Sequence, residues 1–198
     1  MSPDARIPLF PLHCVLVPGG RLPLRIFEPR YLDLVRDCSR DDSGFGVCLL
    51  LPDPEGGDAH HHARIGTLAR IVDFHTLDDG LLGIVTRGQR RFRILDTTVR
   101  NNGLLLGSVT WLREAAHRQV PEDCSLLADI TARFLDRLGS NYPEYRHQDL
   151  QDAAWVAYRL IEWLPLPPIE QQVLLELNDP VQRLQRLLRL LPEHLPEA

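Results

Sequence analysis

The chain of 198 residues contains no lysine, so all 22 of its basic residues are arginine. A P-loop nucleotidase needs the lysine of the GxxxxGK[ST] motif to reach the terminal phosphates, and this chain therefore holds no P-loop ATPase. Its net charge at pH 7 is -5. A broad basic surface for nucleic acid would have to be built against that overall sign, which disfavours nucleic acid as a partner.

The sequence also lacks long apolar runs and paired cysteines. No stretch of about 18 apolar residues is present to span a bilayer, and the opening segment is rich in proline rather than basic and then apolar. We therefore expect a cytoplasmic protein with no signal peptide and no membrane partner. Its four cysteines are scattered without a CxxC pair, which predicts reduced thiols.

The first half of the chain has the patterning of β-strands. Short apolar runs and alternating apolar and polar stretches predict strands at Arg6–Phe10, Cys14–Val17, Phe45–Leu51, Ala63–His75, Leu81–Val99 and Leu104–Leu112. Asp78-Asp79-Gly80 and Asn101-Asn102-Gly103 separate such stretches and favour tight turns, because these residues tolerate positive φ. One short helix is expected from Pro29, since apolar residues recur at helical spacing as far as Cys38.

In the second half the apolar period changes to that of helices. The pattern predicts helices at Leu126–Leu138, Leu150–Leu164, Ile169–Leu177 and Pro180–Leu191. Asp179 is the expected N-cap of the last helix, with Arg183, Arg186 and Arg189 on its exposed face. We expect two domains, a β domain over residues 1–117 and an antiparallel helical bundle over residues 118–198.

Several segments, taken in order, resemble the N-terminal or substrate-binding domain of the Lon proteases. IPLFPL at Ile7–Leu12 and LPLRIFEPRY at Leu22–Tyr31 resemble the opening of that family. IGTLARI at Ile65–Ile71 and DDGLLGIVTRGQRRFRI at Asp78–Ile94 resemble its next blocks. The apolar segment that begins at Leu166 resembles, less specifically, the helical part that follows in Lon itself.

The resemblance implies an α+β fold, in which a PUA-like curled antiparallel sheet or pseudobarrel with one short helix precedes a helical bundle. In whole Lon proteases this domain precedes an ATPase and a serine–lysine peptidase, and the missing lysine removes both from this chain. The leading hypothesis is a non-enzymatic module without cofactors. It would bind unfolded or extended polypeptide, by strand addition or at an apolar rim, for presentation to a separate protease or chaperone.

The first group of candidate binding residues surrounds the start of the expected short helix. Phe27, Glu28, Arg30 and Tyr31 would form a recognition patch there. A structural interpretation also accounts for them, with Glu28 stabilised by the helix dipole, Arg30 as its local partner, and Phe27 and Tyr31 as a packing pair.

Arg91 and Arg93 form the second group, because alternation places both on one face of a strand. RNA binding through this face is the alternative function, and it predicts a salt-sensitive complex that is lost in Arg91→Glu. The ridge would be narrow and without interleaved aromatic residues, which favours a simple solvated strand face.

Two further patterns are weaker. His60, His61 and His62 suggest a transition-metal site, but no second ligand cluster accompanies them, which favours a solvated loop. Cys14 lies beside His13, but neighbours on an extended strand point to opposite faces, so no nucleophile–base pair is expected. The oligomeric state is left open.

Overall fold

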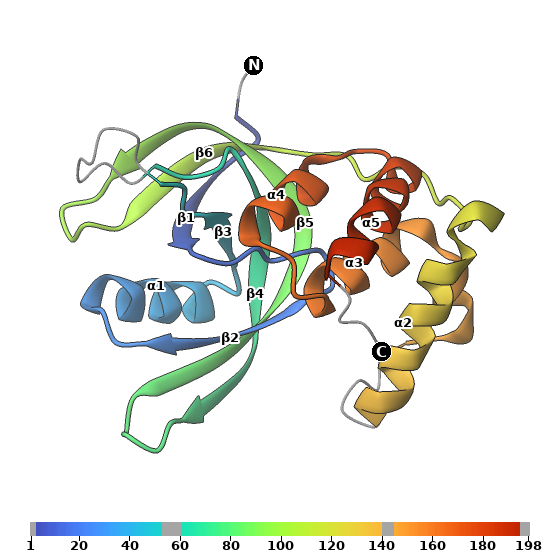
Figure 1. Cartoon of the computed structure of the whole chain (residues 1–198). Coiled ribbons are helices and arrows are strands. Elements are labelled where there is room, and N and C mark those ends of the chain that lie inside the picture. Colours follow the sequence, from blue (N-terminus) through green and yellow to red (C-terminus); the bar gives the residue numbers. More distant parts are fainter. Residues whose placement is uncertain (1–2, 53–60, 140–144, 195–198) are drawn as a thin grey trace. The chain divides into compact units, whose positions relative to one another are not determined.

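The computed structural model describes residues 3–52, 61–139 and 145–194. The chain divides into two compact units, Met1–Arg113 and Glu114–Ala198. The sequence pattern places the change slightly later, after residue 117. Figure 1 shows the strands gathered in the first unit and most of the helices in the second.

The described part of the first unit holds six strands and one helix. They are β1 (Ala5–Leu12), β2 (Arg21–Ile26), α1 (Pro29–Arg40), β3 (Phe45–Leu49), β4 (Ile65–Thr76), β5 (Leu82–Val99) and β6 (Leu105–Trp111). The strand predicted at Cys14–Val17 is wrong, because this segment is irregular and leads into the turn before β2. Its apolar side chains Leu16 and Val17 are nevertheless buried, so the apolar run indicated burial in the core and did not indicate a strand.

All six strands belong to one sheet, in the order β2-β5-β4-β3-β1-β6, and β6 pairs with β5 as well. The path of paired strands from β5 through β4, β3, β1 and β6 therefore returns to β5 (Figure 1). The length of β5 allows this, since its first half pairs with β2 and its second half with β6.

The sheet is mixed, so the prediction of a purely antiparallel sheet is wrong. β1 and β3 run parallel, whereas the other pairs are antiparallel. A parallel pair needs a long crossover connection, and here the chain supplies β2 and α1 between the two strands. The sequence pattern predicted α1 but missed β2, and it gave no sign of the parallel direction.

β1 changes partner in its middle. Residues up to Pro8 pair with β6, and residues from Leu9 onward pair with β3. Proline has no N–H to donate, so Pro8 and Pro11 weaken a continuous ladder along this strand. Beyond Pro8, none of the described strands pairs with the edge of β1 that had faced β6.

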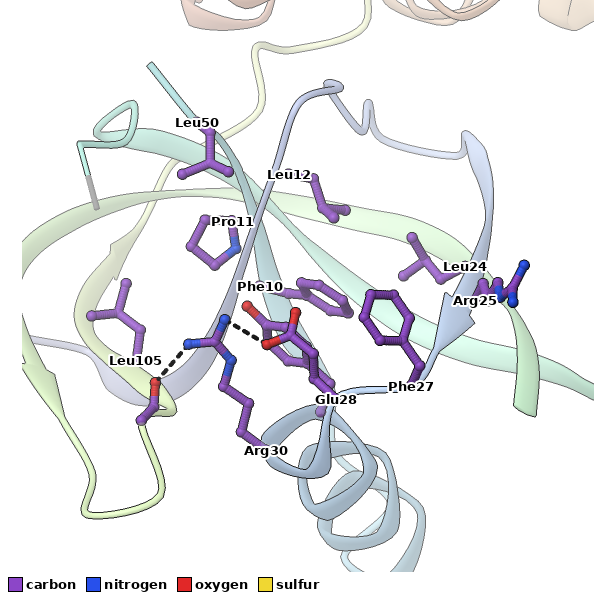
Figure 2. Close-up of a pocket in the computed structure, with 12 residues that line it drawn as sticks. Phe10, Pro11, Leu12, Leu24, Arg25, Phe27, Glu28, Arg30, Leu50 and Leu105 are labelled. Carbon is purple, nitrogen blue, oxygen red and sulfur yellow. Dashed lines mark hydrogen bonds and ion pairs between the residues drawn. The ribbon is translucent and has the colours of Figure 1, made fainter. Parts of the chain in front are cut away.

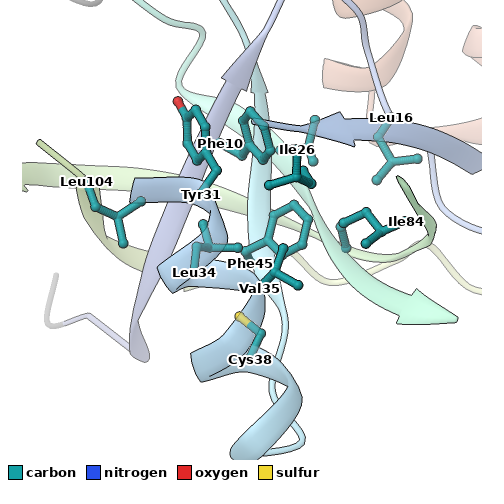
Figure 3. Packing of buried hydrophobic residues seen from close by; sticks show 12 residues of the cluster. Phe10, Leu16, Ile26, Tyr31, Leu34, Val35, Cys38, Phe45, Ile84 and Leu104 are labelled. Carbon is teal, nitrogen blue, oxygen red and sulfur yellow. The ribbon is translucent and has the colours of Figure 1, made fainter. Parts of the chain in front are cut away.

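The main core cluster of this unit lies between α1 and the sheet (Figure 3). The helix buries Tyr31, Leu34, Val35 and Cys38, which confirms the predicted helical face. The Tyr31 ring stacks on Phe10 of β1, with ring centroids 3.8 Å apart and planes inclined by 13°. Burial of such side chains contributes about 1.5–3 kcal/mol each, and it fixes α1 against β1.

The described part of the second unit is helical. Its α-helices are α2 (Ser125–Leu138), α3 (Ala153–Trp163), α4 (Pro168–Glu176) and α5 (Pro180–His194), with short 3-10 helices at Glu122–Cys124 and His147–Gln151. α3 packs against both α2 and α5. No helix within the described ranges is long and apolar enough to cross a membrane.

Two aspartates determine where helices of this unit begin. Asp152 accepts hydrogen bonds from the backbone N–H groups of Ala154 and Trp155, at 2.8 and 3.0 Å, and thereby divides the single helix predicted at Leu150–Leu164. Asp179 accepts from Val181 N–H at 2.9 Å, which confirms it as the N-cap of α5.

Arg183 is buried, with only 1% of its surface exposed, so its predicted place on an exposed helix face is wrong. Its Nε donates to the carbonyl oxygen of Leu174 at 2.9 Å and its Nη2 to that of Leu177. The guanidinium also lies 4.3 Å from the Tyr158 ring centroid. Arg183 therefore donates to two carbonyl groups at the end of α4, the part of a helix where carbonyl oxygens need donor partners beyond the helix ladder. A planar guanidinium can reach two such oxygens at once, which an ammonium group does less well.

We predict that Arg183→Ala lowers the free energy of unfolding by about 2–4 kcal/mol, because two charge-assisted hydrogen bonds are lost in a buried site. Arg183→Lys should recover less than half of the loss. Urea denaturation measures both, with the exposed Arg189→Ala as the control, expected within about 0.5 kcal/mol of the parent. If Arg183→Lys were as stable as the parent, the planar guanidinium that reaches two carbonyl oxygens would not be needed.

Asp4 ties the start of the chain to β6. Its Oδ2 accepts from Thr110 Oγ1 at 2.6 Å and from Trp111 N–H at 2.8 Å. These hydrogen bonds, first that of Thr110, lower the pKa of Asp4 below its ordinary value of 3.8. The contribution of the Asp4 charge to stability is therefore complete above the pKa of the unfolded state. It is lost as the pH falls through the lowered pKa of the folded state.

We predict that Asp4→Asn, which keeps an acceptor but removes the charge, lowers Tm at pH 7. The difference from the parent should shrink as the pH drops below 3.8. Thermal unfolding followed across pH measures this, with the exposed Asp96→Asn as the control. A Tm difference that stays constant down to the acid limit would show that the charge is not the cause.

Candidate functional site

Four of the six predicted binding residues line one pocket in the first unit (Figure 2). It encloses about 260 Å³ and is named the β1–α1 pocket below. The lining consists of Phe10, Pro11, Leu12, Leu24, Arg25, Phe27, Glu28, Arg30, Tyr31, Leu50, Gly103 and Leu105. The structure thus brings the first predicted group together around a largely apolar hollow.

The pocket lies where β1 has separated from β6. Phe10, Pro11 and Leu12 come from the half of β1 that pairs with β3, and Leu105 begins β6. The segment between β2 and α1 contributes Phe27 and Glu28, because Pro29 starts the helix immediately afterwards. The change of partner along β1 therefore opens the space that these side chains surround.

The predicted packing pair of Phe27 and Tyr31 is wrong. Tyr31 stacks on Phe10, and Phe27 leaves 62% of its surface exposed. Figure 2 shows the Phe27 ring beside Phe10 and Leu24 at the rim. A large exposed aromatic ring next to an apolar hollow marks a surface that gains from contact with another apolar group.

An ion pair forms the polar wall of the pocket. Glu28 Oε2 lies 2.7 Å from Arg30 Nη2, which confirms Arg30 as the local partner of Glu28. Arg30 Nη1 donates to the carbonyl oxygen of Gly103 at 3.3 Å, and the guanidinium lies 4.8 Å from the Tyr31 ring centroid. Gly103 has a φ of +81°, a conformation that favours glycine, so the turn before β6 can present this carbonyl.

The lining of the pocket is mainly apolar. The described residues that form it include no histidine, cysteine, serine or threonine. Tyr31 contributes a hydroxyl group, and burial raises the pKa of that phenol, which keeps it neutral near pH 7. Among the charged residues of the lining, Glu28 and Arg30 pair with each other, and Arg25 pairs with Asp79.

The structure contradicts the predicted arginine ridge. Arg91 is 0% exposed, whereas Arg93 is exposed. On this strand it is Arg90, outside the predicted pair, whose guanidinium lies over an aromatic ring, 3.6 Å from the centroid of Trp111. Strand alternation predicts which residues share a face of the sheet but not whether that face is covered. Thr67, which pairs with Arg91 on β4, is buried as well.

The two weaker candidate sites gain no support. His60 lies outside the described residues, while His61 and His62 Nδ1 each lie near a backbone carbonyl oxygen, at 3.3 and 3.1 Å. Among the described residues there is no group of three potential metal ligands. Cys14 is not in a strand, so alternation does not separate it from His13, but burial raises the pKa of its thiol and disfavours the nucleophilic thiolate.

Sequence reasoning missed the β1 side of the pocket and its far rim. Phe10, Pro11 and Leu12 stand within the IPLFPL segment that carried the family resemblance, and Gly103 within the Asn-Asn-Gly turn. In the sequence both segments are signals of the fold, and neither points to a pocket. Only the partner change of β1 places them around one hollow.

The chain belongs to the family of the ATP-dependent protease La (Lon) substrate-binding domain, whose model matches residues 6–193. Among solved structures it is similar to the Lon N-terminal domain protein from Xanthomonas campestris. The two are 43% identical with a TM-score of 0.78, over 93% of this chain and 98% of that one.

Curated relatives include much longer proteins. Protein cereblon from Danio rerio is 31% identical over 147 residues, which make up 71% of this chain and 31% of cereblon. A Lon protease from Parabacteroides distasonis is 25% identical over 193 residues, which make up 93% of this chain and 23% of the protease. The chain thus spans less than a third of either relative.

We predict that all four cysteines react slowly with iodoacetamide at pH 8 in the folded protein. Burial raises the pKa of every thiol, that of Cys48 to about 12, so little thiolate is present. Cys14 should react first because it alone is partly exposed. Mass-spectrometric mapping over time measures the order, with urea-unfolded protein as the control. Rapid, complete labelling of Cys14 at neutral pH would revive it as a nucleophile.

Proposed function

We propose that this chain is a non-enzymatic module that binds exposed segments of other polypeptides and holds an apolar side chain in the β1–α1 pocket. The observation that carries the proposal is the exposed Phe27 ring beside an open hollow walled by Phe10, Tyr31 and aliphatic residues. Apolar surface left in water at such a rim favours association with another apolar side chain.

The size of the pocket supports a side chain as its ligand. Sites for drug-sized molecules and cofactors span roughly 300–1,000 Å³. The β1–α1 pocket, at about 260 Å³, is smaller than that range. A space of this size accommodates one or two side chains, with the rest of a bound segment lying outside on the surface.

Side-chain insertion is better supported here than strand addition. Two edges could receive an extended peptide, that of β1 beyond Pro8 and the outer edge of β2. Pro11 and Pro23 lie on these strands and have no N–H to donate. A peptide strand placed at either edge would therefore form an incomplete ladder, and the binding energy would come mainly from the pocket.

Family membership supports polypeptide as the ligand class, because the matching model describes a substrate-binding domain of a protease. Presentation of the bound segment to a separate protease or chaperone is part of our proposal. So is the assignment of the closed sheet to a PUA-like pseudobarrel followed by a helical bundle. No observation favours the RNA-binding alternative, since burial of Arg91 removes half of the ridge on which it rested.

We predict that Phe27→Ser weakens binding of a short fluorescent peptide with a single phenylalanine by about tenfold, equivalent to about 1.4 kcal/mol, because partial burial of one aromatic ring is lost. Leu126→Ser on α2, with a similarly exposed apolar side chain, is the control and should leave the affinity unchanged. Fluorescence anisotropy measures both. Equal affinity of the two variants, or equal binding of a peptide with alanine in place of phenylalanine, would refute the proposal.

A further inference from the structure

A second hollow lies beside the β1–α1 pocket, at the end of the β4–β5 hairpin. It encloses about 440 Å³ and is named the hairpin hollow below. Its lining consists of Pro23, Leu24, Arg25, His75, Leu77, Asp78 and Asp79. Leu24 and Arg25 line both hollows, so the two spaces adjoin across β2. Figure 2 shows these two residues at the rim of the β1–α1 pocket, on the side of Phe27.

The two hollows differ in charge. In the β1–α1 pocket, Glu28 is neutralised by Arg30. In the hairpin hollow, Asp79 pairs with Arg25 and also accepts from Leu81 N–H at 3.1 Å, while the exposed Asp78 has no ion-pair partner among the described residues. The lining thus holds two carboxylates, those of Asp78 and Asp79, against one guanidinium, that of Arg25. The hairpin hollow therefore carries a net negative charge.

The hairpin hollow has an apolar part and an acidic part. Pro23, Leu24 and Leu77 are apolar, and the two carboxylates lie at the turn. Arginine and lysine have this same division, with an aliphatic stem that packs on apolar surface and a charged end that stays near water and carboxylates. The Arg25–Asp79 ion pair is exposed, with 58% of the Arg25 side chain in solvent, so it is a weak competitor for the carboxylate.

We propose that the two hollows form one continuous binding groove across β2, which selects polypeptide segments with a basic residue close to the apolar anchor. The anchor enters the β1–α1 pocket, and the basic side chain lies along Leu24 and Leu77 with its charge at Asp78 and Asp79. This inference rests on the proposed function and adds a charge preference to it. Leu24 and Arg25 line both hollows, so we expect the two ligand residues to stand a few positions apart in an extended segment, which rises by roughly 3.3 Å per residue.

The test uses the full chain and labelled peptides with one phenylalanine and with arginine, leucine or glutamate two to four positions away on either side. At low salt we expect the best arginine peptide to bind about two- to fivefold more tightly than its glutamate and leucine counterparts, a range set by the strength of exposed ion pairs. The preference should fall in Asp78→Asn and persist in Asp96→Asn, which removes an exposed carboxylate outside both hollows.

A second variant should change the preference for the arginine peptide in the opposite direction. Arg25→Gln removes the internal competitor for Asp79, so it should strengthen the preference for the arginine peptide, an effect that local damage to the fold would not produce. This inference is overturned if phenylalanine peptides bind equally well whatever the charge of the flanking residue. It is also overturned if the preference for arginine is unchanged in Asp78→Asn. Either result leaves the proposed function standing. Equal binding of phenylalanine and alanine peptides would refute both.

Discussion

The partner change in the middle of β1 is the constraint on which the rest of the first unit depends. Because β1 pairs with β6 up to Pro8 and with β3 from Leu9, it joins two parts of the sheet and lets the path of paired strands return to β5. The same change opens the edge of β1 near Phe10. The stack of Phe10 on Tyr31 then fixes α1 against β1, and the β1–α1 pocket remains beside it.

A chain without lysine uses arginine for two quite different tasks. Arg183 is buried and satisfies carbonyl groups at the end of α4, while Arg30 stands at a pocket wall and links Glu28 to the turn at Gly103. Both tasks need one side chain to reach two acceptors, which the planar guanidinium does. In a chain without lysine, arginine thus performs both tasks.

Local patterns predicted most of the elements but not their pairing. The alternation in β4 and β5 and the Pro29 helix start were visible because periodicity and proline act locally. The parallel run of β1 with β3 was not visible, since strand direction depends on contacts far apart in the chain. For the candidate site, the stretch from Phe27 to Tyr31 was found, whereas the β1 wall was not. Arg91 was misjudged because alternation says nothing of what covers a face.

By itself, the sequence determined the family and the helix starts at Pro29 and Asp179, because these follow from residue identity and short-range geometry. The tertiary structure decided which side of β1 is left open, which aromatic ring Tyr31 meets, and whether each arginine is buried or exposed. Those outcomes depend on which distant surfaces come together, and a hollow exists only once several segments surround it.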